Sequence, residues 1–178
     1  FDAGSGTGNV RGLTSYVVDG VTYVTPLGRY DDNLSVYSVD ENGQFTQEHS
    51  YAGAGFSRMV TSTTVNIDGT LVYYSATTAA GLNYYTIDLV GDLTLPQSMP
   101  DSSSTSLGDI AVLETGFLQG NTFLFVASSW DAGLAVYKID ATGDLAQTFY
   151  IEPGVVGFNA PSAITTFQVG DRAFAVMA

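Results

Sequence analysis

The chain has 178 residues, a formal net charge of −13 and no cysteine. With 45% hydrophobic and 12% aromatic residues it can bury a sizeable core, which excludes a disordered acidic chain. The five basic residues cannot form the positive stripe that neutralises phosphates, so we expect no nucleic-acid partner, and the absence of cysteine excludes disulfides and thiolate metal sites.

The predicted elements, in chain order, are short strands arranged as hairpins. Residues 14–18 and 21–25 are rich in β-branched and aromatic residues and flank Asp19-Gly20, a dipeptide that favours a two-residue hairpin turn. Equivalent hairpins are expected at residues 61–75, 110–128 and 164–177, the third with a longer turn over 116–121. Neither a helical stripe nor an apolar run of about 18 residues occurs, so we expect no membrane insertion.

After each of the first three hairpins comes a segment that repeats. Residues 33–45, 81–93 and 133–145 align without gaps, at offsets of 48 and then 52 residues. Six columns match, and they are Leu34/Leu82/Leu134, Tyr37/Tyr85/Tyr137, Val39/Ile87/Ile139, Asp40/Asp88/Asp140, Gly43/Gly91/Gly143 and Phe45/Leu93/Leu145. The Asp and Gly columns predict a turn, because an Asp carboxylate accepts local backbone N–H groups and Gly supplies the positive φ that the chain reversal needs.

Each repeat therefore contains four strands, which we call a, b, c and d, in about 50 residues. Four antiparallel strands per repeat favour an all-β β-propeller, here with about 3.5 four-stranded blades, part of a seven-bladed ring. Residues 1–178 are then one partial propeller, with blades at about 10–56, 57–107 and 108–161 and a partial blade at 162–178. An all-β sandwich is the alternative, but it does not explain why whole four-strand units resemble one another.

The repeat also carries a family resemblance. Residues 133–145 have the form Gly-Leu-x-Val-Tyr-x-Ile-Asp-x-x-Gly-Asp-Leu. This unit resembles the blades of the lactonase-like (YVTN-type) seven-bladed propellers, above all those in large secreted, calcium-associated proteins of marine bacteria. The resemblance covers about residues 10–178. It implies a secreted or cell-surface bacterial protein, and it implies lactone hydrolysis as one candidate activity.

The last hairpin, at residues 164–177, is an a–b pair that no c–d pair follows. Two copies of the chain would supply about seven blades, but they would place one a–b pair directly before another. We therefore expect the chain to belong to a longer polypeptide, and we expect the remaining blades of the same or a longer chain as partners.

Candidate catalytic and metal-binding residues are few. His49 is the single histidine, and we expect it to be an exposed strand residue without a catalytic role. Two aspartate pairs, Asp88/Asp92 and Asp140/Asp144, place carboxylates at hairpins, where turn initiation is the favoured interpretation and calcium the weaker one. We predict no catalytic residue, no metal site and no cofactor.

The b–c connections are the candidate binding loops, because all of them leave a propeller on one face. They contain Tyr30, Asp31, Asp32, Trp130 and Asp131. Trp130 beside Asp131 could stack on a sugar ring while the carboxylate accepts hydroxyl groups, so the expected partner on this face is a protein or a carbohydrate. The favoured alternative is structural: Trp130 packs between blades and Asp131 caps a turn.

The sequence thus predicts a secreted or surface-associated propeller that acts as a binding or structural module, without catalysis. The alternative is a lactonase-like hydrolase whose active site lies partly in blades outside this chain.

Overall fold

The computed structural model describes residues 10–28, 33–53, 56, 59–77, 81–102, 105, 107–129, 133–151, 161–170 and 172–178. These residues form an all-β fold of three four-stranded antiparallel sheets and one two-stranded sheet. Blade 1 contains β1 (Val10–Val18), β2 (Val21–Gly28), β3 (Asn33–Val39) and β4 (Phe45–Ala52). Blade 2 contains β5 (Met59–Ile67), β6 (Thr70–Thr77), β7 (Gly81–Ile87) and β8 (Leu93–Met99). Blade 3 contains β9 (Ile110–Leu118), β10 (Asn121–Ser128), β11 (Gly133–Ile139) and β12 (Leu145–Ile151), and the half-blade contains β13 (Ile164–Val169) and β14 (Arg172–Met177).

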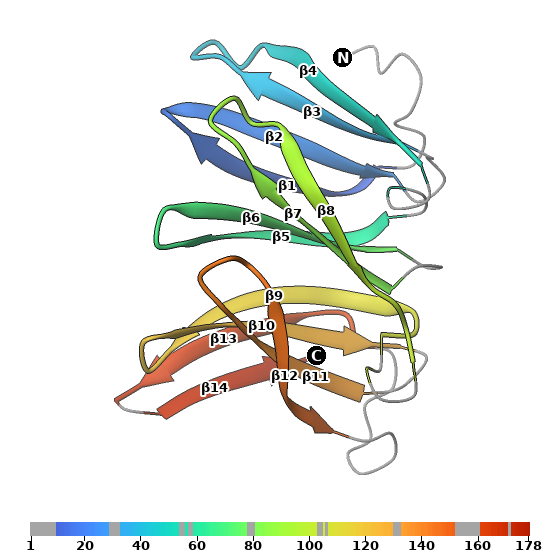
Figure 1. The fold of residues 1–178 in the computed structure, drawn as a ribbon, viewed down its shortest axis with the longest axis vertical. Coiled ribbons are helices and arrows are strands. Elements are labelled where there is room, and N and C mark those ends of the chain that lie inside the picture. Colours follow the sequence, from blue (N-terminus) through green and yellow to red (C-terminus); the bar gives the residue numbers. More distant parts are fainter. Residues whose placement is uncertain are drawn as a thin grey trace.

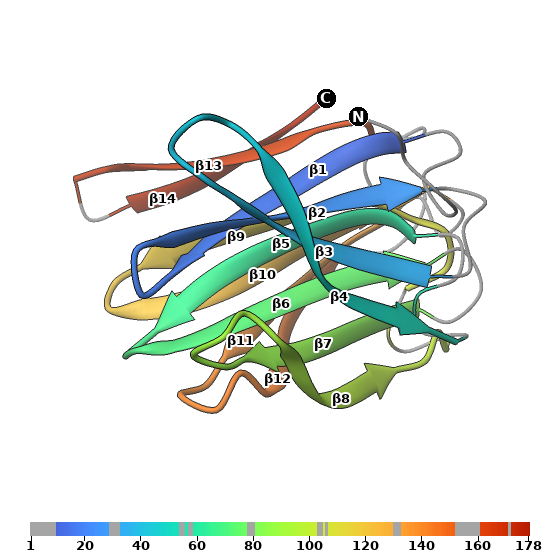
Figure 2. The same ribbon diagram turned by 90° about the horizontal axis from the view of Figure 1, so that it is seen from above.

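The blades are arranged as in a β-propeller. Within each four-stranded sheet the strands pair in chain order, and the first strands β1, β5, β9 and β13 contact one another in that sequence. These four are therefore the inner strands. Figure 1 shows blade 1 at one end of the molecule and the half-blade near the other, and Figure 2 shows the same stack from above. The predicted fold class, a partial propeller of about three and a half blades, is confirmed.

The hairpin turns follow the predicted chemistry in the first two blades. Asp19 and Gly20 have φ of 48° and 80°, and Asp68 and Gly69 have φ of 50° and 94°. Two consecutive positive φ values define the tight turn whose twist matches the flanking strands, and Asp tolerates the left-handed region better than most residues.

The longer turn expected over residues 116–121 is wrong. Strand β9 continues to Leu118, and the turn is the two-residue Gln119-Gly120, with φ of 48° and 76°. Gly116 lies inside the strand because the half-blade approaches it: a Cβ at this position would meet the Thr166 Oγ1 at 2.8 Å. The glycine provides space for a neighbour rather than a chain reversal.

The c–d turns are held by the aspartates that begin them. The Asp88 carboxylate accepts hydrogen bonds from the backbone N–H groups of Val90 and Asp92, each at 2.9 Å. Asp140 accepts equivalent bonds from the backbone of Thr142 and Asp144. Turn initiation is therefore confirmed as the role of these aspartates.

In blades 2 and 3 the glycine of the c–d turn has a second role, because the preceding blade packs against it. A Cβ on Gly91 would lie 2.6 Å from the Tyr23 ring of blade 1. A Cβ on Gly143 would lie 2.8 Å from Val72 of blade 2. A tyrosine hydroxyl also donates to each glycine carbonyl: Tyr16 to Gly91 at 3.0 Å, and an equivalent bond to Gly143 at 2.8 Å from the b-strand residue Tyr74.

The core lies between the blades. One cluster of buried apolar side chains joins blades 1 and 2, and a second joins blades 2 and 3. Tyr73 and Tyr74, which are adjacent on β6, face opposite neighbours: Tyr73 packs in the first cluster and Tyr74 in the second, and both are fully buried. Blade 2 therefore contributes its two faces to two different interfaces.

His49 is not the exposed residue that the sequence predicts. Its side chain is 24% exposed, its Nε2 lies 3.2 Å from the Val90 carbonyl oxygen of blade 2, and its Nδ1 lies 3.9 Å from Asp92. Beside it the Tyr51 hydroxyl donates to Asp92 and accepts the Leu93 N–H at 2.8 Å. The outer strand β4 reaches across to the next blade, which a single blade's strand pattern cannot reveal.

We predict that Gly91→Ala destabilises the protein more than Gly20→Ala, although both glycines have a φ near 80°. Each substitution incurs the left-handed penalty of about 1–2 kcal/mol for an L-residue. Gly91→Ala also forces a methyl group against the Tyr23 ring, which adds about 1–3 kcal/mol, whereas nothing lies within 4 Å of the Gly20 position. Urea unfolding measures both variants, and equal losses of unfolding free energy would contradict the interblade role.

Buried tyrosines predict a loss of stability at alkaline pH. Desolvation by burial raises the pKa of Tyr73, Tyr85 and Tyr137 from 10.0 to about 12. Because the unfolded chain loses these protons first, the stabilisation is complete below pH 10 and is lost as the pH rises from 10 towards 12. We expect urea midpoints to fall in this window, with tyrosinate absorbance rising as the protein unfolds. Tyr85→Phe should reduce the slope, and normal titration of all tyrosines near pH 10 in the folded state would contradict the prediction.

Candidate functional site

The registers place the beginnings of all inner strands at one end of the blades. Val10 pairs with Gly28, Met59 with Thr77, and the first residue of β9 with the last of β10. The b strands therefore end where the a strands begin, so the b–c connections leave from this same end. We call it the b–c end.

Each inner strand begins with an irregularity. In blade 1 the pairing passes from Val10 directly to Gly12, which leaves Arg11 unpaired, and in blades 2 and 3 the unpaired residues are Val60 and Ala111. In the half-blade the N–H groups of Ser162 and Ala163 both bond to the Ala178 carbonyl, again two residues against one. Such bulges re-aim a side chain out of the regular alternation of a strand.

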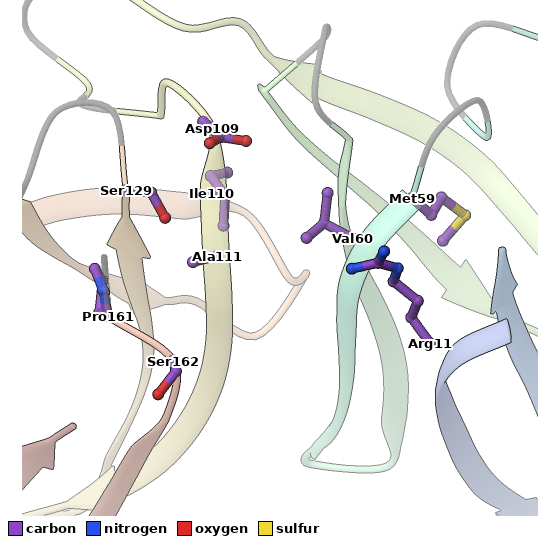
Figure 3. Close-up of a pocket in the computed structure, with 9 residues that line it drawn as sticks. All are labelled: Arg11, Met59, Val60, Asp109, Ile110, Ala111, Ser129, Pro161 and Ser162. Atoms are coloured by element: carbon purple, nitrogen blue, oxygen red, sulfur yellow. The ribbon is translucent and has the colours of Figure 1, made fainter. Parts of the chain in front are cut away.

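The re-aimed residues meet at one pocket of about 260 Å³. Its lining consists of Arg11, Met59, Val60, Asp109, Ile110, Ala111, Ser129, Pro161 and Ser162. Arg11 is the one base and Asp109 the one carboxylate in this lining, and both side chains are exposed to solvent. Figure 3 shows the Arg11 side chain extending from β1 across β5, and Asp109 at the beginning of β9 on the other side of the pocket.

Asp109 is held in an unusual backbone conformation by the strand beside it. Its φ is 49°, and its carbonyl accepts the Ser129 N–H at 3.0 Å. The Ser128 hydroxyl donates to the carbonyl of Gly108. These two bonds hold the chain just before β9 in place, and the Asp109 side chain remains exposed.

The binding residues predicted from the sequence, Tyr30, Asp31, Asp32, Trp130 and Asp131, lie outside the described residues, so that prediction stays untested. The b–c connection of blade 3 does reach the pocket through its first residue, Ser129. The pocket is therefore at the face where binding was expected, but it is built by the inner strands.

Sequence reasoning missed Arg11 and Asp109. A signal for Arg11 exists: counted from the hairpin turns, it occupies the position of Val60, Ala111 and Ser162, and it is the one charged residue in that column. Comparing the a-strand beginnings, as well as the c–d segments, would have exposed it. No feature of the sequence marks Asp109 in this way, because its place in the pocket depends on the residues of other blades that lie opposite it.

The described part of the chain contains no cluster of side chains suited to a metal site. No group of three or more His, Cys, Asp or Glu side chains there could hold an ion. The Asp140 carboxylate is committed to its own turn, and hydrogen bonds from the Thr142 hydroxyl and backbone lower its pKa below the usual value. None of the described segments is a helix long and apolar enough to cross a membrane.

The fold and the pocket define the class: an all-β protein of β-propeller blades with a pocket at the b–c end of its inner strands. No protein-family model matches the chain, and no curated protein matches it. Among solved structures, an exo-β-1,3-galactanase from Phanerochaete chrysosporium is 13% identical with a TM-score of 0.62, over 99% of this chain and 46% of that one. A periplasmic gluconolactonase from Pseudomonas aeruginosa is 18% identical with a TM-score of 0.57, over 96% of this chain and 43% of that one.

The chain thus spans less than half the length of these two structures. At such identities the likeness shows the propeller fold, with a lactonase among its examples. The finer resemblance to YVTN-type repeats stays a prediction.

We predict that Asp109→Asn leaves the free energy of unfolding within about 0.5 kcal/mol of the parent, because Asn also tolerates a φ of 49°. Asp109→Val should lose about 2 kcal/mol, because a β-branched residue is strained in the left-handed region. Urea unfolding compares the two. A large loss with Asn would instead assign the Asp109 carboxylate a structural role.

Proposed function

We propose that this chain is the binding part of a propeller and holds a small, neutral, sugar-type ligand at the b–c end, with no chemistry of its own. The observation that carries the proposal is the pocket in which bulged Arg11 and strained Asp109 lie exposed on opposite sides. A charged residue in a strained backbone conformation at a pocket favours a binding role over a packing role.

The chemistry of the pair suits hydroxyl groups. Arg11 offers up to five N–H donors and Asp109 accepts only, so together they can bind both sides of a polyhydroxylated ring. The walls supply apolar surface from Met59, Val60 and Ile110. Ligand pockets commonly measure roughly 300–1,000 Å³, so a pocket of about 260 Å³ suits a ligand of about one sugar ring.

The charge of the chain and of the pocket also restricts which ligands fit. The chain has a net charge of −13, which disfavours the approach of anions. One arginine and one aspartate in its lining leave the pocket close to neutral. A neutral sugar therefore fits better than a phosphorylated or acidic one.

Hydrolysis is the second candidate. It is favoured by the names of the structural neighbours, a galactanase and a gluconolactonase. Glycoside hydrolysis generally uses two carboxyl groups flanking the bond to be broken, however, and the described lining of this pocket has only Asp109. A hydrolase of this kind would need further residues from beyond the described part of the chain.

The proposal includes a location outside the cell or at its surface, and a larger partner at the b–c end. The acidic, base-poor composition supports a secreted or cell-surface protein. The b–c connection that carries Trp130 directly follows the pocket residue Ser129 in sequence, and the connection that carries Tyr30 leaves blade 1 from the same end. Both would extend the contact to a larger carbohydrate or a protein.

Isothermal titration or ligand-observed NMR with galactose, glucose and gluconate tests the proposal. We expect the neutral sugars to bind more tightly than gluconate. Arg11→Gln and Asp109→Asn should each weaken binding about 10- to 100-fold, the range for lost hydrogen bonds to charged groups. Lys138→Gln is the matched control, because it removes the same charge from an exposed residue near the other end of β11 and should leave binding unchanged.

Two results would oppose this proposal. Sugar binding that neither pocket variant weakens would place the site elsewhere. Turnover of gluconolactone or an aryl galactoside that is lost in Asp109→Asn would replace the binding function with the hydrolase.

A further inference from the structure

Hydrogen bonds from the end of β10 hold the short segment that leads into β9. The Ser128 hydroxyl donates to the Gly108 carbonyl, and the Ser129 N–H donates to the Asp109 carbonyl at 3.0 Å. Ser128 is the last residue of β10, and Ser129 begins the b–c connection of blade 3. Figure 3 shows Asp109 and Ser129 at neighbouring strand ends beside the pocket.

A third bond and a buried side chain anchor the beginning of the same segment. The Leu107 N–H donates to the Asp101 carboxylate at 2.9 Å. The Leu107 side chain is fully buried and packs in the cluster that joins blades 2 and 3. Residues 107–109 are therefore fixed at their first position by packing and at the next two by the end of β10.

The backbone of Asp109 needs such support, because its conformation is unfavourable. Its φ of 49° lies in the left-handed region, which disfavours residues that have a Cβ. In the described part of the chain, the other non-glycine residues with positive φ are Asp19, Asp68 and Gln119, and each precedes a turn glycine with positive φ. Asp109 instead precedes the strand residue Ile110, so no hairpin turn accounts for its conformation.

Ser128 supplies the side-chain bond of this arrangement. It is fully buried, so its hydroxyl needs a partner inside the protein. It pairs with the first residue of β9, and Thr77 occupies the same place in blade 2, opposite the first residue of β5. Blade 1 has Gly28 there. The blade thus forms without a hydroxyl at this position, and blade 3 uses its hydroxyl to hold the segment before Asp109.

The pocket depends on where this segment holds Asp109. Arg11 and Asp109 are the one base and the one carboxylate of the lining, and they come from blades 1 and 3. A sugar that bonds to both requires a fixed separation between them, because hydrogen bonds weaken steeply when distance or angle is poor. A carboxylate that is held in advance also spares the ligand the cost of ordering it.

We propose that Ser128 is a positioning residue of the pocket, which keeps the Asp109 carboxylate opposite Arg11 by holding the Gly108 carbonyl. The inference rests on the proposed sugar-binding function, and it adds to the binding apparatus a buried residue that touches no ligand. Without the Ser128 hydroxyl, Asp109 is still present but can relax to a more favourable φ, and its carboxylate then leaves its place.

Two measurements on the same variants test the proposal. Amide hydrogen exchange of Ser129 reports on its bond to the Asp109 carbonyl, and it needs no ligand. Titration with galactose reports on the pocket. We expect Ser128→Ala to speed the Ser129 exchange and to weaken galactose binding, each about 2- to 10-fold, the range for one lost hydrogen bond.

Two variants serve as controls. Ser128→Thr keeps a hydroxyl where blade 2 has Thr77, so it should retain slow exchange and full binding. Ser75→Ala is the matched control, because Ser75 is also fully buried on a b strand. The Ser75 hydroxyl has no hydrogen-bond partner in the part of the chain that the structure describes, so its loss should change neither measurement.

A double-mutant cycle separates positioning from a general loosening of blade 3. If Ser128 acts through the Asp109 carboxylate, Ser128→Ala should weaken galactose binding much less in an Asp109→Asn background than in the unmodified protein. A merely structural role would instead give the same factor in both backgrounds.

Three results would overturn the proposal. The first is an unchanged Ser129 exchange in Ser128→Ala, which means that the segment keeps its place without the hydroxyl. The second is faster exchange with unchanged galactose affinity. The third is an equal loss of affinity in both backgrounds of the cycle. Failure of the proposed function is recognised separately and earlier, since the unmodified protein then binds no sugar at all.

Discussion

The close approach of one blade to the turn glycine of the next is the contact on which the rest of this structure depends. Gly91 and Gly143 have positive φ and also lie where a Cβ would overlap Tyr23 or Val72. One residue type therefore satisfies two constraints, the chain reversal within a blade and the docking between blades. Because the apolar clusters extend across these contacts, no blade has a complete core by itself.

This dependence shapes the polar chemistry of the interfaces as well. Tyrosine hydroxyls donate to the carbonyls of the same turn glycines, from Tyr16 on an a strand in one interface and from Tyr74 on a b strand in the other. The turn glycine carbonyl is the acceptor in both interfaces, whereas the donating tyrosine lies on a different strand in each. The geometry of the turn, rather than any particular tyrosine, thus defines the interface, and aromatic residues on either strand can serve it.

The same stacking brings the residues of the pocket together. Four inner strands begin with a bulge or a two-against-one pairing, and the stack places Arg11, Val60, Ala111 and Ser162 around one pocket. The repeated strands build the pocket, and the polar character of the pocket comes from positions at which one blade differs from the others. Arg11 is such a departure, and Asp109, held by the b–c connection beside it, provides the opposite charge.

The sequence by itself determined the blade, because the signals for its turns are local: Asp19-Gly20 adopts positive φ, and Asp88 bonds to its own turn. The tertiary structure decided the rest, because it depends on neighbours in other blades. Gly116 looks like a turn residue until the half-blade is placed against it, and His49 looks exposed until blade 2 is placed beside it. The pocket belongs to this second class, since its arginine and aspartate lie in blades that only the stacking brings together.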